Sequence, residues 1–189
     1  MMLYKNIADE IIRMSQDDDS IREKLLRTGE LHGGYHPEME AIHRQNAKRL
    51  REIIAEIGYP TISKVGEVAS NSAWLIVQHA IGEPDFMEDC YELLLDNIAD
   101  INLANFAYLH DRIQFFRSKP QRYGTQLTRC GKIYPVEDTS ALNALRKCMD
   151  LPPFNHIEIG EIEHVEQIPL LDKENGTYND WRKKVGWIS

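Results

Sequence analysis

The spacing of apolar residues after Pro37 predicts a long helix. From Met39 to Ile57 apolar side chains recur three or four positions apart, which is the period of one helix face. Proline suits the first turn of a helix, where its missing N–H has no partner to lose. Gly58 and Pro60 are typical of a helix end. We therefore expect a helix that begins at Pro37 and ends near Ile57.

An acidic run interrupts the helical pattern near the N-terminus. Apolar residues lie at helical spacing up to Asp17–Asp19 and not directly after it. Ser20 and Glu23 then have the spacing of a capping box, in which each side chain bonds the other residue's backbone N–H. The pattern predicts one helix that ends at the acidic run and a second, short helix that stops near Gly29.

Short connections separate three more segments with a helical pattern, and a fourth follows a long loop. Helices that are joined by a few residues lie antiparallel. The pattern therefore predicts an all-α fold, an antiparallel helical bundle with Trp74, Leu75, Leu94, Leu109 and Phe116 in its core. The expected bounds are Val65 to Ile81, Phe86 to Ile98, Leu103 to Phe116 after an Asn102 cap, and Ser140 to Met149.

Two segments lack this pattern. Residues 118–139 contain several glycines and prolines and form a long polar loop, and loops of this length are usually functional. From His156 to Val165 apolar and polar residues alternate with period two, which is typical of a strand or an extended arm. We interpret residues 154–189 as an extended C-terminal appendage to a helical domain of residues 1–153. The appendage is a candidate contact for a homo-oligomer.

Composition narrows the class of protein. With 189 residues, 42% of them hydrophobic and 28% charged, the chain resembles one soluble globular domain. No apolar run approaches the roughly 18 to 20 residues of a membrane span, and no export signal is visible, so we expect a cytoplasmic protein. A net charge of −8 disfavours a nucleic-acid partner. The three widely spaced cysteines predict free thiols, not disulfides.

The segment from Leu31 to His43 contains three histidines and two glutamates around a glycine pair. Gly33–Gly34 permit a turn with positive φ, and His36, Glu40 and His43 then share one edge of the following helix. A hydrogen bond from Glu40 to His43 would orient the imidazole and raise its basicity. In the structural alternative, His36 is a helix cap and the other two form a surface pair.

Metal binding is a separate question for these residues. Glu40 and His43 have the Glu-x-x-His spacing of di-iron bundles, but no helix supplies the second pair that such a site needs. Three histidines with an open position are a catalytic zinc arrangement, so a mononuclear zinc site of His36, His43 and His79 stays open. No cofactor and no metal ligand is predicted.

Polar residues elsewhere are candidates for substrate binding. Gln78 and His79 interrupt an apolar segment, where buried polar groups need partners. Asp111 and Arg112 form either a structural ion pair or an arginine that holds an anion. The loop after Pro120 is rich in hydrogen-bond donors. The predicted substrate-binding residues are Gln78, Asp111, Arg112, Gln121, Arg122, Tyr123 and Gln126.

Four stretches of this sequence resemble a bacterial family of unknown function, DUF6624. They are LHGGYHPEME at 31–40, AWLIVQHA at 73–80, YLHDR at 108–112 and PQRYGTQ at 120–126. The resemblance spans about Leu31 to Pro153 and includes Leu151-Pro-Pro, before which family members commonly have glycine where this chain has Asp150. It implies that these segments form one domain, and it implies no reaction. The tail after Phe154 lies outside it.

Our leading hypothesis is an acid–base enzyme, hydrolytic in type, that acts on a small polar or phosphorylated molecule. In this hypothesis His43, oriented by Glu40, is the general base, and His36 or His79 is the acid. The alternative is a non-catalytic acidic interaction protein, for example an immunity or inhibitor-like protein, to which the negative charge is suited.

The two hypotheses differ in the arrangement of the polar groups. An enzyme needs its histidines and its binding loop in one concave pocket, whereas an interaction protein spreads its acids over a convex face. On the enzyme hypothesis, Tyr123, Gln126 and Arg112 approach His36 and His43 around a small polar or anionic ligand.

Overall fold

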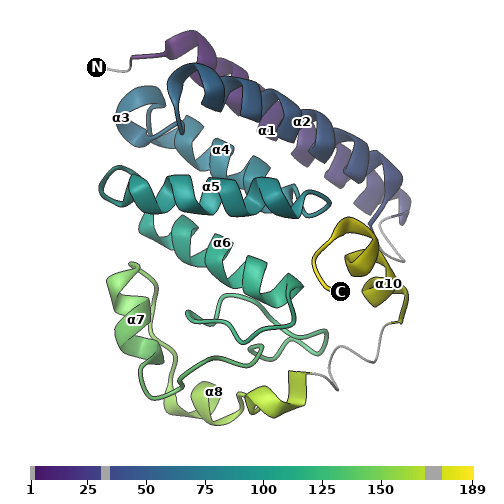
Figure 1. Ribbon diagram of the computed structural model, residues 1–189, viewed down its shortest axis with the longest axis vertical. Helices are drawn as coiled ribbons and strands as arrows, with labels where there is room; N and C mark the ends of the chain where they lie inside the picture. Colours follow the sequence, from purple (N-terminus) through teal and green to yellow (C-terminus); the bar gives the residue numbers. More distant parts are fainter. Residues whose placement is uncertain (1–2, 31–34, 169–175) are drawn as a thin grey trace. The chain divides into compact units, whose positions relative to one another are not determined.

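The computed structural model describes residues 3–30, 35–168 and 176–189, and in these ranges it is an all-α protein, as predicted (Figure 1). The chain forms two compact units, Met1–Asn102 and Leu103–Ser189, and each is described by itself. Within the described ranges no helix is long and apolar enough to cross a membrane. The first unit contains α1 (Lys5–Thr28), α2 (Pro37–Ile57), α3 (Ile62–Val65), α4 (Glu67–His79), α5 (Pro84–Asp96) and a short 3-10 helix (Ile98–Asp100).

Helix α4 is the centre of the first unit, because it packs against α1, α2, α3 and α5. Its buried side chains include the small residues Ala69 and Ala73, which allow neighbouring helices to approach closely. The predicted helix from Val65 to Ile81 is divided at Gly66, whose φ of 81° breaks the helix. Of the five predicted core residues, Leu94, Leu109 and Phe116 are buried, whereas Trp74 and Leu75 are partly exposed.

Helix α1 is continuous, so the predicted end at Asp17–Asp19 is wrong. Ala8, Ile11, Ser15, Asp18 and Leu25 form its buried stripe. Asp18 therefore lies on the face that packs against α2 and α4, where tertiary contacts outweigh the weak helix propensity of aspartate. The expected cap at Ser20 is also wrong, since its hydroxyl donates to the carbonyl of Gln16 inside the helix.

Helix α2 has the predicted bounds and runs beside α1 (Figure 1). His36 is its N-cap, and the Nδ1 atom of His36 accepts the backbone N–H of Glu38 at 3.2 Å. Gly58 follows the last turn with a φ of 71°. The predicted turn at Gly33–Gly34 lies outside the described residues.

The second unit contains α6 (Leu103–Phe116), a long loop, α7 (Leu142–Cys148), α8 (His156–Gly160), a 3-10 helix (Val165–Gln167) and α10 (Gly176–Val185). The loop between α6 and α7 was predicted, and it folds back on itself through single bridges between Gln121 and Val136 and between Leu127 and Ile133. Ala107 of α6 packs with Tyr123 of the loop and with Leu151. The helix predicted at Ser140–Met149 is confirmed as α7.

The alternating segment from His156 to Val165 is not a strand, which corrects the prediction. Asn155 and Glu158 form a capping box that starts α8, and this local signal outweighs a short period-two pattern. Further along, Arg182 is buried and donates to the carbonyl of Phe116 at 3.1 Å. The division of the chain at residue 153 stays a prediction.

Candidate functional site

A buried carboxylate, Asp18, lies between two imidazole rings in the first unit. Asp18 comes from α1, His43 from α2 and His79 from the last position of α4. These three helices pack against one another, and that packing brings together residues that are far apart in sequence. We call the three side chains the Asp–His–His cluster.

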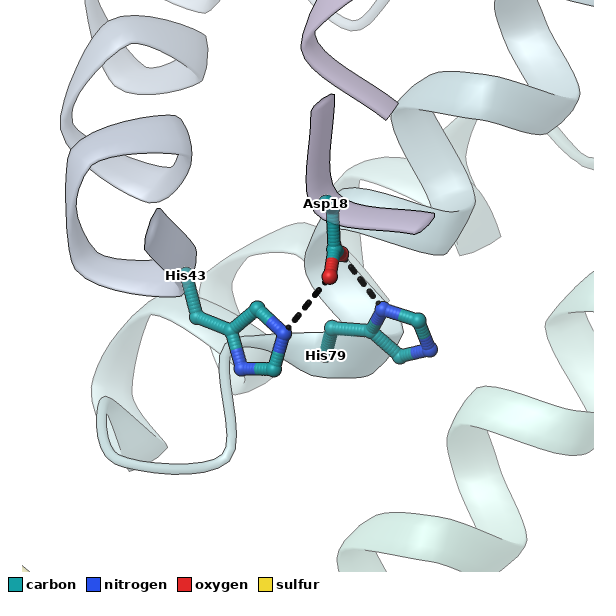
Figure 2. Close-up of side chains that lie close together, drawn as sticks. All are labelled: Asp18, His43 and His79. Carbon is teal, nitrogen blue, oxygen red and sulfur yellow. Dashed lines mark hydrogen bonds and ion pairs between the residues drawn. The ribbon is translucent and has the colours of Figure 1, made fainter. Parts of the chain in front are cut away.

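Both oxygens of the Asp18 carboxylate accept a hydrogen bond (Figure 2). Nε2 of His43 lies 3.0 Å from Oδ1, and Nδ1 of His79 lies 2.6 Å from Oδ2. The two imidazole centroids are 5.2 Å apart. Each ring is therefore held at one nitrogen by the same carboxylate.

Tyr35 extends this hydrogen-bonded chain. Its hydroxyl lies 2.7 Å from Nδ1 of His43, and the two rings are stacked. Because Nε2 of a neutral His43 donates to Asp18, its Nδ1 accepts the hydroxyl proton of Tyr35. Burial, followed by the negative charge of Glu40, raises the pKa of Tyr35 and keeps this proton in place.

Asp18 is anionic in the folded protein. Burial by itself raises the pKa of Asp18, but its hydrogen bonds and electrostatic interactions with His43 and His79 together outweigh burial. The pKa of Asp18 consequently lies well below its ordinary value. The cluster therefore offers a permanent negative charge to any positive charge that develops on either ring.

His79 is the accessible member of the cluster. The exposed fractions of the side chains are 1% for Asp18, 7% for His43 and 22% for His79. The second ring nitrogen of His79, Nε2, points away from Asp18 in Figure 2. Nothing in residues 3–30, 35–168 or 176–189 forms a hydrogen bond with this atom. Nε2 of His79 is thus the nitrogen that can exchange a proton with a small molecule.

The predicted hydrogen bond between Glu40 and His43 is wrong. Glu40 instead accepts from Nε and Nη2 of Arg44, at 2.9 and 2.8 Å. Arg44 is one helical turn further along the exposed edge of α2, whereas His43 turns inward to Asp18. Catalytic roles for Glu40 and for His36, which caps α2, stay predictions.

Several of the predicted substrate-binding residues in the second unit form hydrogen bonds that hold the loop after α6. Asp111 is fully buried, and its carboxylate accepts the backbone N–H groups of Arg122, Tyr123 and Thr125 at 2.9 to 3.1 Å. The Gln121 amide donates to the carbonyls of Gln126 and Tyr134. These bonds shape the loop.

The ligand-binding roles of this loop stay predictions. The approach of this loop and Arg112 to His36 and His43 also stays a prediction, because the loop and these histidines belong to separate units. Gln78 is buried in the first unit, and among the described residues its Oε1 has no hydrogen-bond partner.

The potential metal ligands differ from His36, His43 and His79, the set that the sequence left open for zinc. One carboxylate oxygen of Asp18 and one nitrogen each of His43 and His79 lie within 4.8 Å of one another. The grouping contains Asp18 and not His36. Sequence reasoning missed Asp18, although one signal pointed to it, since Asp18 lies at helical spacing from Ile11 and Leu25 on the stripe that α1 buries.

The fold and the cluster together define an all-α protein in which three helices hold a carboxylate between two imidazoles. A family model matches residues 5–166, and the chain therefore belongs to DUF6624, a family of unknown function. The match is longer than the expected Leu31 to Pro153 and includes Asp18. Neither the curated proteins nor the solved structures contain a significant match to the chain.

Proposed function

We propose that this protein is an acid–base enzyme, that the Asp–His–His cluster is its catalytic centre, and that it hydrolyses a small polar or phosphorylated molecule. One observation supports the proposal above others. Nδ1 of His79 is held at 2.6 Å by an anionic, buried Asp18, while the His79 side chain is 22% exposed and its Nε2 forms no hydrogen bond within the described residues. A carboxylate that fixes one ring nitrogen in this way selects the tautomer whose other nitrogen can accept a proton.

In the proposed reaction, Nε2 of His79 removes a proton from a water molecule as the water oxygen attacks the substrate. The imidazole becomes positively charged, and the carboxylate of Asp18 stabilises that charge without taking the proton itself. The ring then returns the proton to the leaving group, so the enzyme ends in its starting state. General acid–base catalysis of this kind contributes about 10²- to 10⁴-fold.

His43 and Tyr35 are positioning residues in this proposal. Both nitrogens of His43 are already engaged, by Asp18 and by Tyr35, and the ring is buried. His43 therefore holds the Asp18 carboxylate in the orientation in which it bonds His79. The proposal moves the general base from His43 to His79 and replaces Glu40 by Asp18 as the orienting carboxylate.

Two chromogenic probes test the proposal, p-nitrophenyl acetate for ester hydrolysis and p-nitrophenyl phosphate for phosphomonoester hydrolysis. The wild-type protein should hydrolyse at least one of them, and His79→Ala should lower kcat about 10²-fold or more. His156→Ala removes an exposed histidine of the second unit and is the control, with unchanged rates. Equal rates in the wild type and His79→Ala would refute the catalytic role. A non-catalytic interaction protein would hydrolyse neither probe.

A further inference from the structure

The Asp–His–His cluster offers imidazole nitrogens and a carboxylate oxygen, which are common zinc ligands in proteins. The two nitrogens and one carboxylate oxygen lie within 4.8 Å of one another and come from three packed helices. Two imidazoles favour a transition metal, because magnesium and calcium prefer sites made of oxygen atoms. We infer that the cluster binds one divalent transition-metal cation of the zinc class, through Asp18, Nε2 of His43 and Nδ1 of His79.

The spacing of these atoms is close to what a bound cation requires. In a tetrahedral zinc site with bonds of about 2.0 to 2.1 Å, neighbouring ligand atoms lie about 3.3 Å apart. The carboxylate of Asp18 is now 3.0 Å from His43 and 2.6 Å from His79. These two contacts involve different carboxylate oxygens, and the three ligand atoms lie within 4.8 Å of one another. Binding of one cation therefore requires shifts of about 1 to 2 Å, mostly of the more exposed ring, His79.

Cation binding also requires each of the two rings to change its tautomer. In the hydrogen-bonded state the protons are on Nε2 of His43 and Nδ1 of His79, the atoms whose lone pairs would bind the cation. In the cation-bound state the proton of each ring is on the other nitrogen, Nδ1 of His43 and Nε2 of His79. Nδ1 of His43 then donates to the Tyr35 oxygen 2.7 Å away, which can accept as well as donate. Such a second bond fixes the orientation of a ligand histidine.

The site has three protein ligands, and its accessible side is that of His79. A cation held by these three residues would have a fourth position open to water, as catalytic zinc sites usually have. The role of this cation in the reaction rests on the proposed function, but its binding does not. A bound cation would keep the ring proton on Nε2 of His79, so His79 would then be a ligand and not the base, and the cation would supply the activation of water.

The test uses the full-length protein after removal of metals with a chelator. Isothermal titration with Zn²⁺ should show one site per chain, and Co²⁺ should give the visible absorption of a tetrahedral complex. His79→Ala and Asp18→Asn should each weaken Zn²⁺ binding at least tenfold, and Tyr35→Phe about 10- to 100-fold. Mg²⁺ should not compete. His36→Ser should bind Zn²⁺ like the wild type, because His36 is not a ligand of this site.

The outcomes test the cation site and the proposed hydrolysis independently. Equal Zn²⁺ affinity in the wild type and His79→Ala would overturn the cation site. Equal loss in His36→Ser and Asp18→Asn would overturn the assignment of Asp18 as the third ligand. Zn²⁺ binding without hydrolysis of either probe would leave the site standing and refute the proposed function. Hydrolysis by the loaded protein alone would keep the site and exclude His79 as the base.

Discussion

Nδ1 of His79 and Oδ2 of Asp18 are 2.6 Å apart, although 61 positions separate the two residues in sequence. The same carboxylate holds His43 through its other oxygen. Asp18 is consequently the residue on which the geometry of both rings depends, and the clearest predictions concern it.

Asp18→Asn should lower the free energy of unfolding by about 3 kcal/mol, because the buried rings would lose their charged acceptor and face an amide donor. The exposed neighbours on the same helix provide matched controls, since Asp17→Asn and Asp19→Asn remove the same charge from solvent-facing positions. Each control should change stability by no more than about 0.5 kcal/mol. Urea denaturation of the three variants measures the difference, and equal effects would contradict a special role for Asp18.

The contribution of Asp18 should depend on pH in acid. The pKa of Asp18 is lower in the folded protein than in the unfolded chain, where it is about 3.9, so the unfolded state takes up the proton first as pH falls. The stability difference between the metal-free wild type and Asp18→Asn should therefore be full above about pH 4 and shrink below it. Denaturation series from about pH 6 to about pH 2.5 would show this, and a difference that grows on acidification would contradict it.

The helices with strong local signals could be predicted from the sequence. Pro37 and Gly58 mark the ends of α2 by backbone properties that act within a few residues, and the structure has those bounds. A signal of the same local kind starts α8, where the capping box of Asn155 and Glu158 could have been found in the sequence. The alternating pattern that follows favoured a strand instead, and that prediction was wrong.

Asp18 could not be identified in this way. A local interpretation treats Asp17–Asp19 as a helix end, whereas the stability of α1 at this point depends on rings supplied by α2 and α4. Periodicity could have placed Asp18 on the buried stripe, but it could not have named His43 and His79 as the partners. Those partners are set by the packing of three helices, which no local pattern encodes.

Asp150 is predicted to tolerate glycine better than alanine. Its φ is 53°, in the left-handed region, which glycine adopts without steric cost. Asp150→Ala should lower stability by about 1 kcal/mol, because a Cβ without a polar group is disfavoured there. Asp150→Gly should be neutral or stabilising. Thermal unfolding of the two variants gives the order, and a more stable alanine variant would contradict it.

Asp111→Asn should loosen the loop that follows α6. The carboxylate accepts three backbone N–H groups, and an amide would turn a donor toward one or more of them. Stability should fall by about 2 to 3 kcal/mol, and amide hydrogen exchange should accelerate at residues 122–125. Asp138→Asn is the control. At the surface, Asp138 accepts the backbone N–H of Ser140, and the side-chain oxygen of asparagine can accept it as well. Unchanged exchange in Asp111→Asn would contradict the structural role.

The long separations within the Asp–His–His cluster also have a kinetic consequence. Its bonds span 25 and 61 positions, so they form only after the chain has closed those loops and brought three helices together. Contacts that form after the folding transition state slow unfolding and leave the folding rate almost unchanged. We therefore expect Asp18→Asn to speed unfolding more than it slows folding.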